Sequence, residues 1–476
     1  MRERAAGVVV WILPVCALVG LTLDHTHPYQ GDETYYIKSA VWMTESGNWL
    51  LPQYEGVVRL QKPILAYWMT ALGYRAFGTS LWAGRVPFLL AAGALLFVVY
   101  RLGRLLSGSR EAASVAVALL SSSLLFLLFS RVSMTDLPLA LCSTVSLYFL
   151  CRAVGPTGRG QRDAALAHLA MGAGFLAKGA TALMPLAAVA AWLVVSRCGQ
   201  ARAALRAILA PGALAAFALV AMPWHIYVWV VHRGVWLSQF AREASENLGP
   251  GVLASAGHLA YYAGAMVAYQ WPAAALGAWA WWRLRAGERG SRACDGCARN
   301  LAPLMWYAGL SLVVFVFAFA FAHHRDRYLL AIVPALSVVL ARVIHHAGIA
   351  RPARKLAAAA AIVQIAAVWV HGQIVGHPLH ELVARWEQQA RGDLAVHAVP
   401  RREAAWTLAI AGGRLVPYRD EVPYVMTTVA TDGSLSGRPI LHRAFLTQSL
   451  ARESGRLVVK KQAILLLGPR PPLPPR

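Results

Sequence analysis

Residues 84–100 read GRVPFLLAAGALLFVVY and carry one charged side chain, Arg85. A helix of about 17–25 mostly apolar residues is long enough to cross the hydrocarbon core of a bilayer. The composition of the whole chain agrees: hydrophobic residues make up 58% of the 476 residues and charged residues 14%, whereas soluble domains average about 25% charged. These values exclude a soluble globular chain and extended disorder, and they predict a polytopic membrane protein.

Ten further segments have the same apolar character. They cover residues 6–22, 113–129, 137–153, 163–177, 180–196, 207–231, 260–282, 303–322, 328–345 and 356–371. We therefore predict an all-α membrane domain of about eleven spans over residues 1–371. The first outer loop, residues 24–83, is polar but rich in Trp and Tyr, which is typical of interfacial helices at the headgroup level.

The charge distribution predicts the orientation. With the N-terminus in the cytoplasm, the loops on that side hold 20 Lys and Arg against 5 Asp and Glu, as the positive-inside rule requires. The net charge of +23 is then largely a topology signal, and nucleic acid is not predicted as a partner. The six cysteines are too few for a disulfide scaffold, and Cys294 and Cys297 lack the second pair of a structural zinc site.

Residues 372–476 differ in kind, because they hold 14 basic and 8 acidic residues together with several prolines. Gly, Pro and Asp bound the short apolar runs Arg414–Pro417, Tyr424–Val429 and Leu457–Leu467, a pattern that favours strands. We predict a small extracytoplasmic α/β domain here.

Three carboxylates lie at the outer ends of apolar segments. Asp32 and Glu33 follow the first span, and Asp136 lies in the second outer turn. Capping a helix could be the sole role of each aspartate. The alternative is a catalytic base or a metal-binding acid at the membrane surface, and the sequence leaves both open.

Basic residues also gather on the outer side, against the topology bias. Lys178 ends a short Gly-rich segment, and residues 323–328 read HHRDRY at the outer end of the ninth span. Snorkelling of the lysine and ordinary phospholipid contacts would explain both features. The functional alternative is a site for a lipid phosphate or a lipid-linked sugar phosphate.

An ordered set of motifs carries a family resemblance. It comprises Asp32-Glu33 with Tyr36, residues 46–49 with Pro52, Lys62-Pro63 with Tyr67-Trp68, Arg85 with Pro87, Arg131 to Pro138, residues 176–179, Pro223-Trp224, and Arg327 to Pro334. In this order and topology, over residues 1–345, the chain resembles the GT-C membrane glycosyltransferases that use polyprenyl-phosphate sugars. The nearest likeness is to the bacterial aminoarabinose transferases of the lipid A pathway and to the protein O-mannosyltransferases.

The resemblance implies a bacterial inner-membrane enzyme. Its donor would be a sugar on a dolichyl- or undecaprenyl-type phosphate. Its acceptor would be a lipid A-like glycolipid, another glycan or a protein hydroxyl, and the anomeric centre would invert. Asp32 would be the main catalytic carboxylate, with Glu33 and Asp136 as further candidates. The phosphate-binding residues would be Lys62, Lys178, His324, Arg325 and Arg327. The substrate cavity would be lined by Tyr35, Tyr36, Gln61, Tyr67, Arg131, Glu246, Asn247 and Tyr328.

The chain departs from the family pattern at three places. Gln61 stands where relatives often have Glu, Glu246-Asn247 where aminoarabinose transferases often have Glu-His, and Tyr35 where Arg is frequent. The first two places are linked to metal in that group, so a divalent metal and the acceptor both stay open.

Two other functions compete with the transferase. A transporter or flippase would place its charges near the bilayer midplane in repeated halves, whereas here the acids gather at outer ends and no repeat is evident. A membrane scaffold with an outer binding domain would leave the carboxylates of the first loop without a purpose. The enzyme is therefore favoured.

Overall fold

The computed structural model describes most of the membrane part and the strands of the C-terminal part. The described residues are 12–23, 32–54, 56–155, 159–196, 201–247, 255–286, 295–318, 326–375, 393–397, 414–417, 424–428, 440–453 and 456–467. His324, Arg325 and Cys294 lie outside these described residues.

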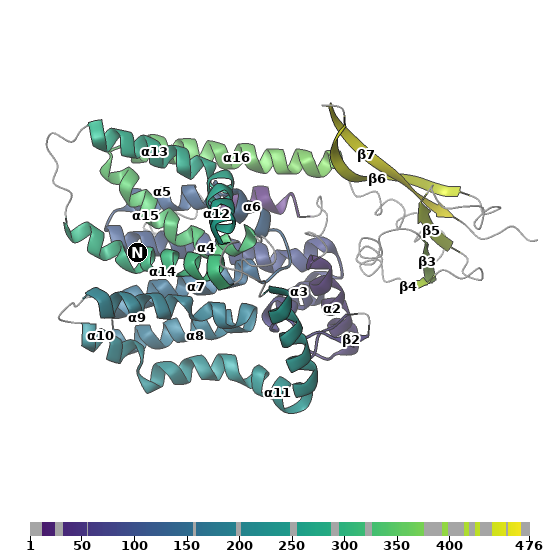
Figure 1. Cartoon of the computed structure of the whole chain (residues 1–476), viewed down its shortest axis with the longest axis horizontal. Coiled ribbons are helices and arrows are strands. Elements are labelled where there is room, and N and C mark those ends of the chain that lie inside the picture. The colour runs from purple at the N-terminus through teal and green to yellow at the C-terminus, as the bar shows by residue number, and fades with distance from the viewer. Residues whose placement is uncertain are drawn as a thin grey trace, which may run out of the picture.

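The membrane part is a bundle of helices (Figure 1). After a helical stretch at residues 12–20, the elements are α2 (Asp32–Ser46), β1 (Gln53–Tyr54), β2 (Val57–Val58), α3 (Leu65–Phe77), α4 (Leu81–Ser107), α5 (Arg110–Ser121), α6 (Leu124–Phe129), α7 (Asp136–Val154), α8 (Gly160–Lys178), η2 (Gly179–Leu183), α9 (Met184–Ser196), α10 (Ala201–Ile208), α11 (Pro211–Asn247), α12 (Ser255–Tyr269), α13 (Trp271–Ala286), α14 (Asp295–Ala318), η4 (Asp326–Ala331), α15 (Val333–His346) and α16 (Ala350–Val375).

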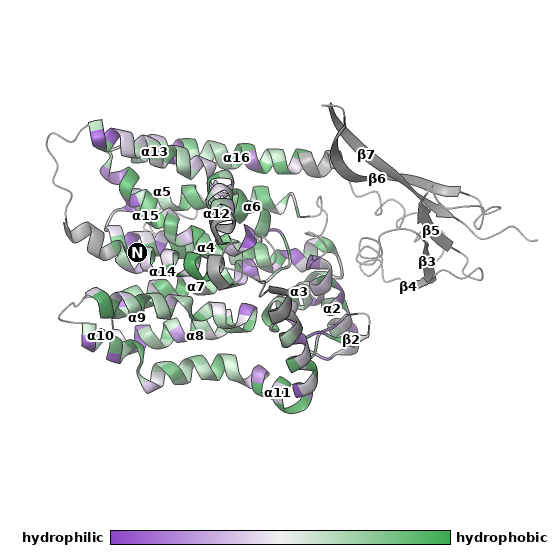
Figure 2. Cartoon of the chain, viewed as in Figure 1, coloured by the Kyte–Doolittle hydropathy of each residue, from purple (hydrophilic) through white to green (hydrophobic). Residues whose placement is uncertain are grey.

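Long apolar helices identify a multi-pass membrane protein. Among the described residues, five helical segments are long and apolar enough to cross a bilayer: Leu81–Ser107, Asp136–Val154, Gly160–Ser196, Ala201–Gln239 and Ala350–Val370. The bundle is predominantly apolar along its helices (Figure 2). Large aliphatic side chains exposed on it, such as Leu90 and Leu219, are those that lipid would cover.

Several predicted spans are interrupted, and the prediction of one continuous helix over 113–129 is wrong. The helix breaks at Ser122–Ser123 between α5 and α6, where the Ser123 hydroxyl caps α6 by accepting a hydrogen bond from the Phe126 amide. Gln270 donates to the Ser123 hydroxyl, and Gln364 donates to the Ser122 carbonyl at 3.1 Å. A break at membrane depth is tolerated when protein groups satisfy the freed backbone in this way.

Two further breaks coincide with prolines. The predicted span 260–282 divides at Gln270 into α12 and α13, with Pro272 in the first turn of α13. The span 328–345 divides into the 3-10 helix η4 and α15, where Pro334 lies in the first turn. Proline suits a helix start because its missing N–H is not needed there. The sequence pattern registers apolarity but not these interruptions.

The first outer loop folds as two helices joined by a short hairpin. Ile37 and Ala40 of α2 pack in one buried cluster with Ala71 and Tyr74 of α3. Trp68 donates its indole N–H to the Trp49 carbonyl at 2.6 Å. These contacts hold α2 and α3 together, so the loop is a defined platform.

The loop is also attached to α11. Trp224 of that helix donates to the Leu50 carbonyl at 2.9 Å. Helix α11 has a non-helical backbone at His232, and beyond this bend Gln239 reaches the β1–β2 hairpin, accepting from the Leu60 amide at 2.6 Å. The bend is visible where α11 turns toward α2 and α3 (Figure 1).

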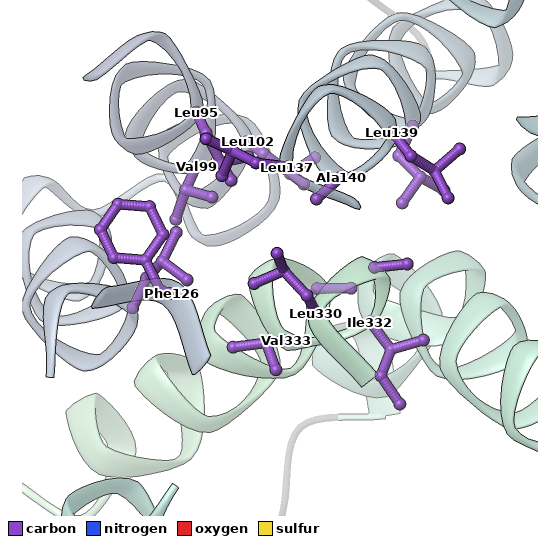
Figure 3. Packing of buried hydrophobic residues seen from close by; sticks show 14 of the residues in the cluster. Leu95, Val99, Leu102, Phe126, Leu137, Leu139, Ala140, Leu330, Ile332 and Val333 are labelled. Atoms are coloured by element: carbon purple, nitrogen blue, oxygen red, sulfur yellow. The ribbon is translucent and has the colours of Figure 1, made fainter. Parts of the chain in front are cut away.

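A buried apolar core joins the elements that carry the candidate site. Its members include residues of α4, α6, α7, η4 and α15, and Figure 3 shows Leu95, Val99, Leu102, Phe126, Leu137, Leu139, Ala140, Leu330, Ile332 and Val333. Because Leu137 follows Asp136 and Leu330 follows Arg327 by three residues, this packing sets the start of α7 beside η4. Dense packing of this kind fixes helix positions within the bilayer, where apolar burial from water no longer does.

The C-terminal part contains a five-stranded sheet of order β4-β3-β5-β7-β6. Its strands are β3 (Asp393–His397), β4 (Arg414–Pro417), β5 (Tyr424–Thr428), β6 (Ile440–Glu453) and β7 (Arg456–Leu467). β3 pairs in parallel with β4 and β5, and β7 pairs antiparallel with β5 and β6. β4, β5 and β7 lie in the three apolar runs from which strands were predicted. Helix α16 ends at Val375, four residues beyond the predicted domain boundary.

Candidate active site

Two ion pairs from four separate elements form the centre of the site. Arg327 of η4 contacts Asp32, the first residue of α2, with 2.5 Å between Nη1 and Oδ2. Lys178, the last residue of α8, contacts Asp136, the first residue of α7, with 2.5 Å between Nζ and Oδ1. The sequence analysis placed all four residues at outer segment ends, and the structure pairs each acid with one base.

The two pairs share one electrostatic environment. Burial by itself would lower the pKa of Arg327, but Asp136 and Asp32 outweigh that effect and raise it. Arg327 therefore lies in the field of both carboxylates. The Lys178 ammonium also lies 4.1 Å from the centroid of the Tyr328 ring, a cation–π distance.

Exposure distinguishes the two aspartates. The Asp136 side chain is 3% exposed, and its partner Lys178 is 10% exposed. The Asp32 side chain is 39% exposed, whereas Arg327 is only 9% exposed. Of the two aspartates, Asp32 is therefore the one whose carboxylate is accessible from the protein surface.

Glu33 has different surroundings from its neighbour Asp32. Its carboxylate is fully buried and accepts hydrogen bonds from Arg85 Nε at 2.8 Å, Arg85 Nη2 at 2.6 Å and the Ser133 amide at 2.7 Å. Arg85 also donates to the Leu23 carbonyl at 2.5 Å. A bidentate pair of this kind is geometrically specific. It ties α2 to α4 and to the turn before α7, which favours a structural role for Glu33.

Arg131 lies beside this buried pair. It is 6% exposed, and its Nε and Nη1 atoms have no hydrogen-bond partner among the described residues. Burial lowers the pKa of Arg131 to about 10, with Arg85 adding to the decrease and Glu33 opposing it. Its electrostatic neighbours are thus the residues of the structural pair.

Tyrosines of the first loop border the two ion pairs. The rings of Tyr36 and Tyr67 are buried, with centroids 4.9 Å apart. Burial raises the pKa of Tyr36, Tyr67 and Asp136 raise it further, and Arg59 and Arg327 oppose the increase. The Tyr36 hydroxyl therefore lies within electrostatic reach of the site. Tyr35 contacts the Tyr54 ring edge-on, with centroids 4.8 Å apart.

The structure also shows site residues that the sequence analysis missed. Asp326 accepts hydrogen bonds from the hydroxyls of Tyr261 and Tyr269 of α12, the second at 2.6 Å. These bonds anchor η4, which carries Arg327. Arg59 stacks over the Tyr35 ring at 3.7 Å from the centroid. No local motif links these residues, because their partners are distant in sequence.

The remaining predicted residues have less structural support. Gln61 and Lys62 are half-buried between the hairpin and α3. Glu246 and Asn247 end α11, but their side chains are outside the described part of the chain, as are His324 and Arg325. Within the described residues, no group of three or more His, Cys, Asp or Glu could hold a metal ion.

Comparisons with known proteins bear on this arrangement. Residues 61–227 match the family described as dolichyl-phosphate-mannose-protein mannosyltransferase. An uncharacterized protein of Aquifex aeolicus is 29% identical over 232 residues, which cover 49% of this chain and 46% of that protein. The undecaprenyl phosphate-alpha-4-amino-4-deoxy-L-arabinose arabinosyl transferase 1 of Sodalis glossinidius is 29% identical over 262 residues, which cover 52% of this chain and 46% of that protein. The chain thus spans less than half the length of these curated relatives.

The crystal structure of ArnT from Cupriavidus metallidurans bound to undecaprenyl phosphate matches over nearly the whole chain. The alignment covers 97% of this chain and 98% of ArnT, with a TM-score of 0.72 and 16% sequence identity. The chain has the ArnT fold. The expected resemblance to GT-C membrane glycosyltransferases is confirmed.

Proposed function

We propose that this protein is an integral membrane glycosyltransferase, which moves a sugar from a polyprenyl-phosphate donor to an envelope acceptor on the outer face of the membrane. The observation that carries the proposal is the presence of two ion pairs in one site, Asp32 with Arg327 and Asp136 with Lys178. It pairs an accessible carboxylate with a buried arginine, and this arginine also lies in the field of Asp136, the partner of Lys178. Transfer from a phosphate leaving group requires such a combination, because a base must meet the acceptor while cations stabilise the phosphate.

The reaction would be a single displacement. The acceptor hydroxyl attacks the anomeric carbon as its proton passes to the Asp32 carboxylate. The bond from that carbon to the phosphate oxygen breaks, its electron pair leaves with the polyprenyl phosphate, and the anomeric centre inverts. Lys178 and Arg327 stabilise the negative charge that develops on the phosphate. Asp136, only 3% exposed, holds Lys178 in position.

The donor class has independent support. The ArnT structure with the same fold is described as bound to undecaprenyl phosphate, and the name of the Sodalis relative specifies an undecaprenyl-phosphate aminoarabinose donor. We assign Lys62, His324 and Arg325 as further phosphate-binding residues, and Tyr35, Tyr36, Gln61, Tyr67, Arg131, Glu246, Asn247 and Tyr328 to the substrate cavity. The acceptor would be a glycolipid, another lipid, a glycan or a protein hydroxyl.

The proposed function requires an outer location for the site. We propose eleven spans, a cytoplasmic N-terminus and an extracytoplasmic domain over residues 372–476. Contacts between two of the loops expected in the cytoplasm support their placement on one common side of the membrane. Arg342 donates to the Ser107 carbonyl at 2.9 Å, and Arg351 lies 3.6 Å from the Glu111 carboxylate.

Donor cleavage tests the proposal directly. Purified protein in nanodiscs would be incubated with a panel of polyprenyl-phosphate sugars and a crude envelope extract as the acceptor source. Release of free polyprenyl phosphate would be followed by mass spectrometry. We expect release by the unmodified protein and by Glu45→Gln, which alters an exposed acid on the same helix, but not by Asp32→Asn.

Two results would contradict the assignment. Full activity of a folded Asp32→Asn variant would remove Asp32 as the base. Absence of release from every donor by the unmodified protein would overturn the transferase, and flux assays for a lipid-linked or anionic substrate would then test the transporter.

A further inference from the structure

We propose that Arg59 is a further donor-binding residue, which contacts the phosphate of the polyprenyl-phosphate sugar from the first outer loop. This inference rests on the proposed function. It adds a residue that neither the charge pattern nor the motif set identified.

Arg59 directly follows β2, and its guanidinium stacks face-on over the Tyr35 ring at 3.7 Å from the ring centroid. Stacking occupies one face of the guanidinium and leaves the N–H groups at its edge for a ligand. The Nε atom is buried and has no hydrogen-bond partner in the part of the chain that the structure describes. Tyr67 contributes a side-chain hydrogen bond to Arg59, and the Nε donor is not used by the described residues.

The balance of charge around the ion pairs points to the same ligand. Asp32 with Arg327 and Asp136 with Lys178 sum to zero, so a phosphate anion that joins them leaves an excess negative charge. Arg59 forms no ion pair with a described carboxylate. A half-buried cation without a counter-ion carries a desolvation cost, and an anionic ligand would offset that cost.

Arg59 also lies next to the ion pairs. Burial would lower the pKa of Arg59, but the phenolic groups of Tyr67, Tyr36 and Tyr35 outweigh this and raise it. The Tyr36 hydroxyl is at the same time in the field of Asp136 and Arg327. Tyr35, on which Arg59 stacks, follows Asp32 by three residues in α2, so the two side chains lie on the same side of the helix about one turn apart. This geometry places Arg59 at the border of the proposed phosphate site.

The backbone on both sides of Arg59 is fixed. The Leu60 amide donates to Gln239 Oε1 at 2.6 Å, and Gln239 Nε2 donates to the Val58 carbonyl at 2.6 Å. The Arg59 amide donates to the Pro52 carbonyl at 2.8 Å. Gln239 is 8% exposed, so α11 holds the residue before and the residue after Arg59. A support of this kind pre-organises a binding side chain and lowers the entropy lost on binding.

Binding of two probes that differ only in the phosphate tests the proposal. The full chain in nanodiscs would be titrated with undecaprenyl phosphate and with undecaprenol, and the bound fraction would be read by native mass spectrometry. We expect Arg59→Ala and Arg59→Gln to weaken undecaprenyl phosphate binding about tenfold or more, since one charge-assisted contact is lost. Undecaprenol binding should not change. Arg75→Ala, which removes an exposed arginine at the end of α3, should bind both probes as the unmodified protein does.

The possible failures are distinguishable. Unchanged undecaprenyl phosphate binding by folded Arg59→Gln would overturn the proposal, and so would an equal loss of both probes, because that result indicates a structural role. If the unmodified protein binds no undecaprenyl phosphate, the proposed function itself fails. Melting temperatures of all variants show which ones are folded, and Arg59→Gln, which keeps part of the aliphatic chain and a planar polar end without the charge, serves if Arg59→Ala is unstable.

Discussion

The substitution Glu33→Gln should destabilise the fold, whereas Asp32→Asn, one residue earlier, should abolish transfer without unfolding the protein. The Glu33 carboxylate accepts hydrogen bonds from Arg85 Nε, from Arg85 Nη2 and from the Ser133 amide, and it is fully buried. A glutamine keeps one acceptor oxygen and turns an NH2 group toward the guanidinium, so at least one charge-assisted bond is replaced by a contact between two donors.

The size of the effect follows from this geometry. Losing a hydrogen bond to a charged group costs about 1.5–3 kcal/mol. The Arg85 guanidinium also stays buried without its counter-ion, beside a second buried arginine, Arg131, whose pKa is already lowered by Arg85. Removing one partner of a buried pair costs about 3–5 kcal/mol in total. Asp32 is 39% exposed, and its partner Arg327 also lies in the field of Asp136. Neutralising Asp32 therefore leaves Arg327 with a nearby carboxylate, and we expect a cost of less than about 1 kcal/mol.

Thermal unfolding in detergent, followed by tryptophan fluorescence, would measure both variants. We expect a melting temperature about 5–10 °C lower for Glu33→Gln and a change of about 2 °C or less for Asp32→Asn. The double substitution Glu33→Gln with Arg85→Gln should recover part of the loss, because no unpaired guanidinium remains at that position. A Glu33→Gln protein that melts with the unmodified one and loses donor cleavage would refute the structural role and make Glu33 catalytic.

Two further predictions concern packing and the anchoring of η4. Gly172→Ala should destabilise the fold by about 1–3 kcal/mol, because a Cβ at this position would lie 2.8 Å from a side-chain atom of α11. The control Gly212→Ala, whose Cβ would meet open space, should have the melting temperature of the unmodified protein. Equal melting temperatures of the two variants would contradict the close approach of the helices. Tyr269→Phe removes a 2.6 Å hydrogen bond to the Asp326 carboxylate. Because Arg327 is adjacent to Asp326, this change should make its position less defined and raise the donor KM about threefold to tenfold. An unchanged KM and kcat would show that α12 does not position this arginine.

The helical membrane architecture could be predicted, because apolarity over a bilayer thickness is a property of local sequence. It depends on the solvent around a segment and not on its partner helices. The interruptions at Ser122–Ser123 and Gln270 were missed because they depend on contacts with other helices. Gln364 donates to the Ser122 carbonyl, and the Gln270 side chain donates to the Ser123 hydroxyl. Such long-range partners leave no periodic signal in sequence.

The candidate site shows the same division. Asp32, Asp136, Lys178 and Arg327 could be named from sequence because each is an ionisable group at the end of an apolar segment, where burial makes charge costly. Arg59 could not, because its position in a polar loop gives it no local distinction. Its proposed role depends on the stack over Tyr35 and on the support from Gln239, 180 residues later.

The adjacent pair Asp32 and Glu33 shows most clearly why sequence reaches its limit here. Consecutive residues of a helix point about 100° apart, so at the start of α2 one carboxylate can face outward and the next inward. The inward one depends on Arg85 of α4 and the Ser133 amide before α7, and the outward one on Arg327 of η4. Sequence records two neighbouring acids of the same chemistry. The fold distinguishes them by burying one carboxylate completely against Arg85 and leaving the other 39% exposed. Under the proposed function, the exposed carboxylate is the one that takes the proton from the acceptor.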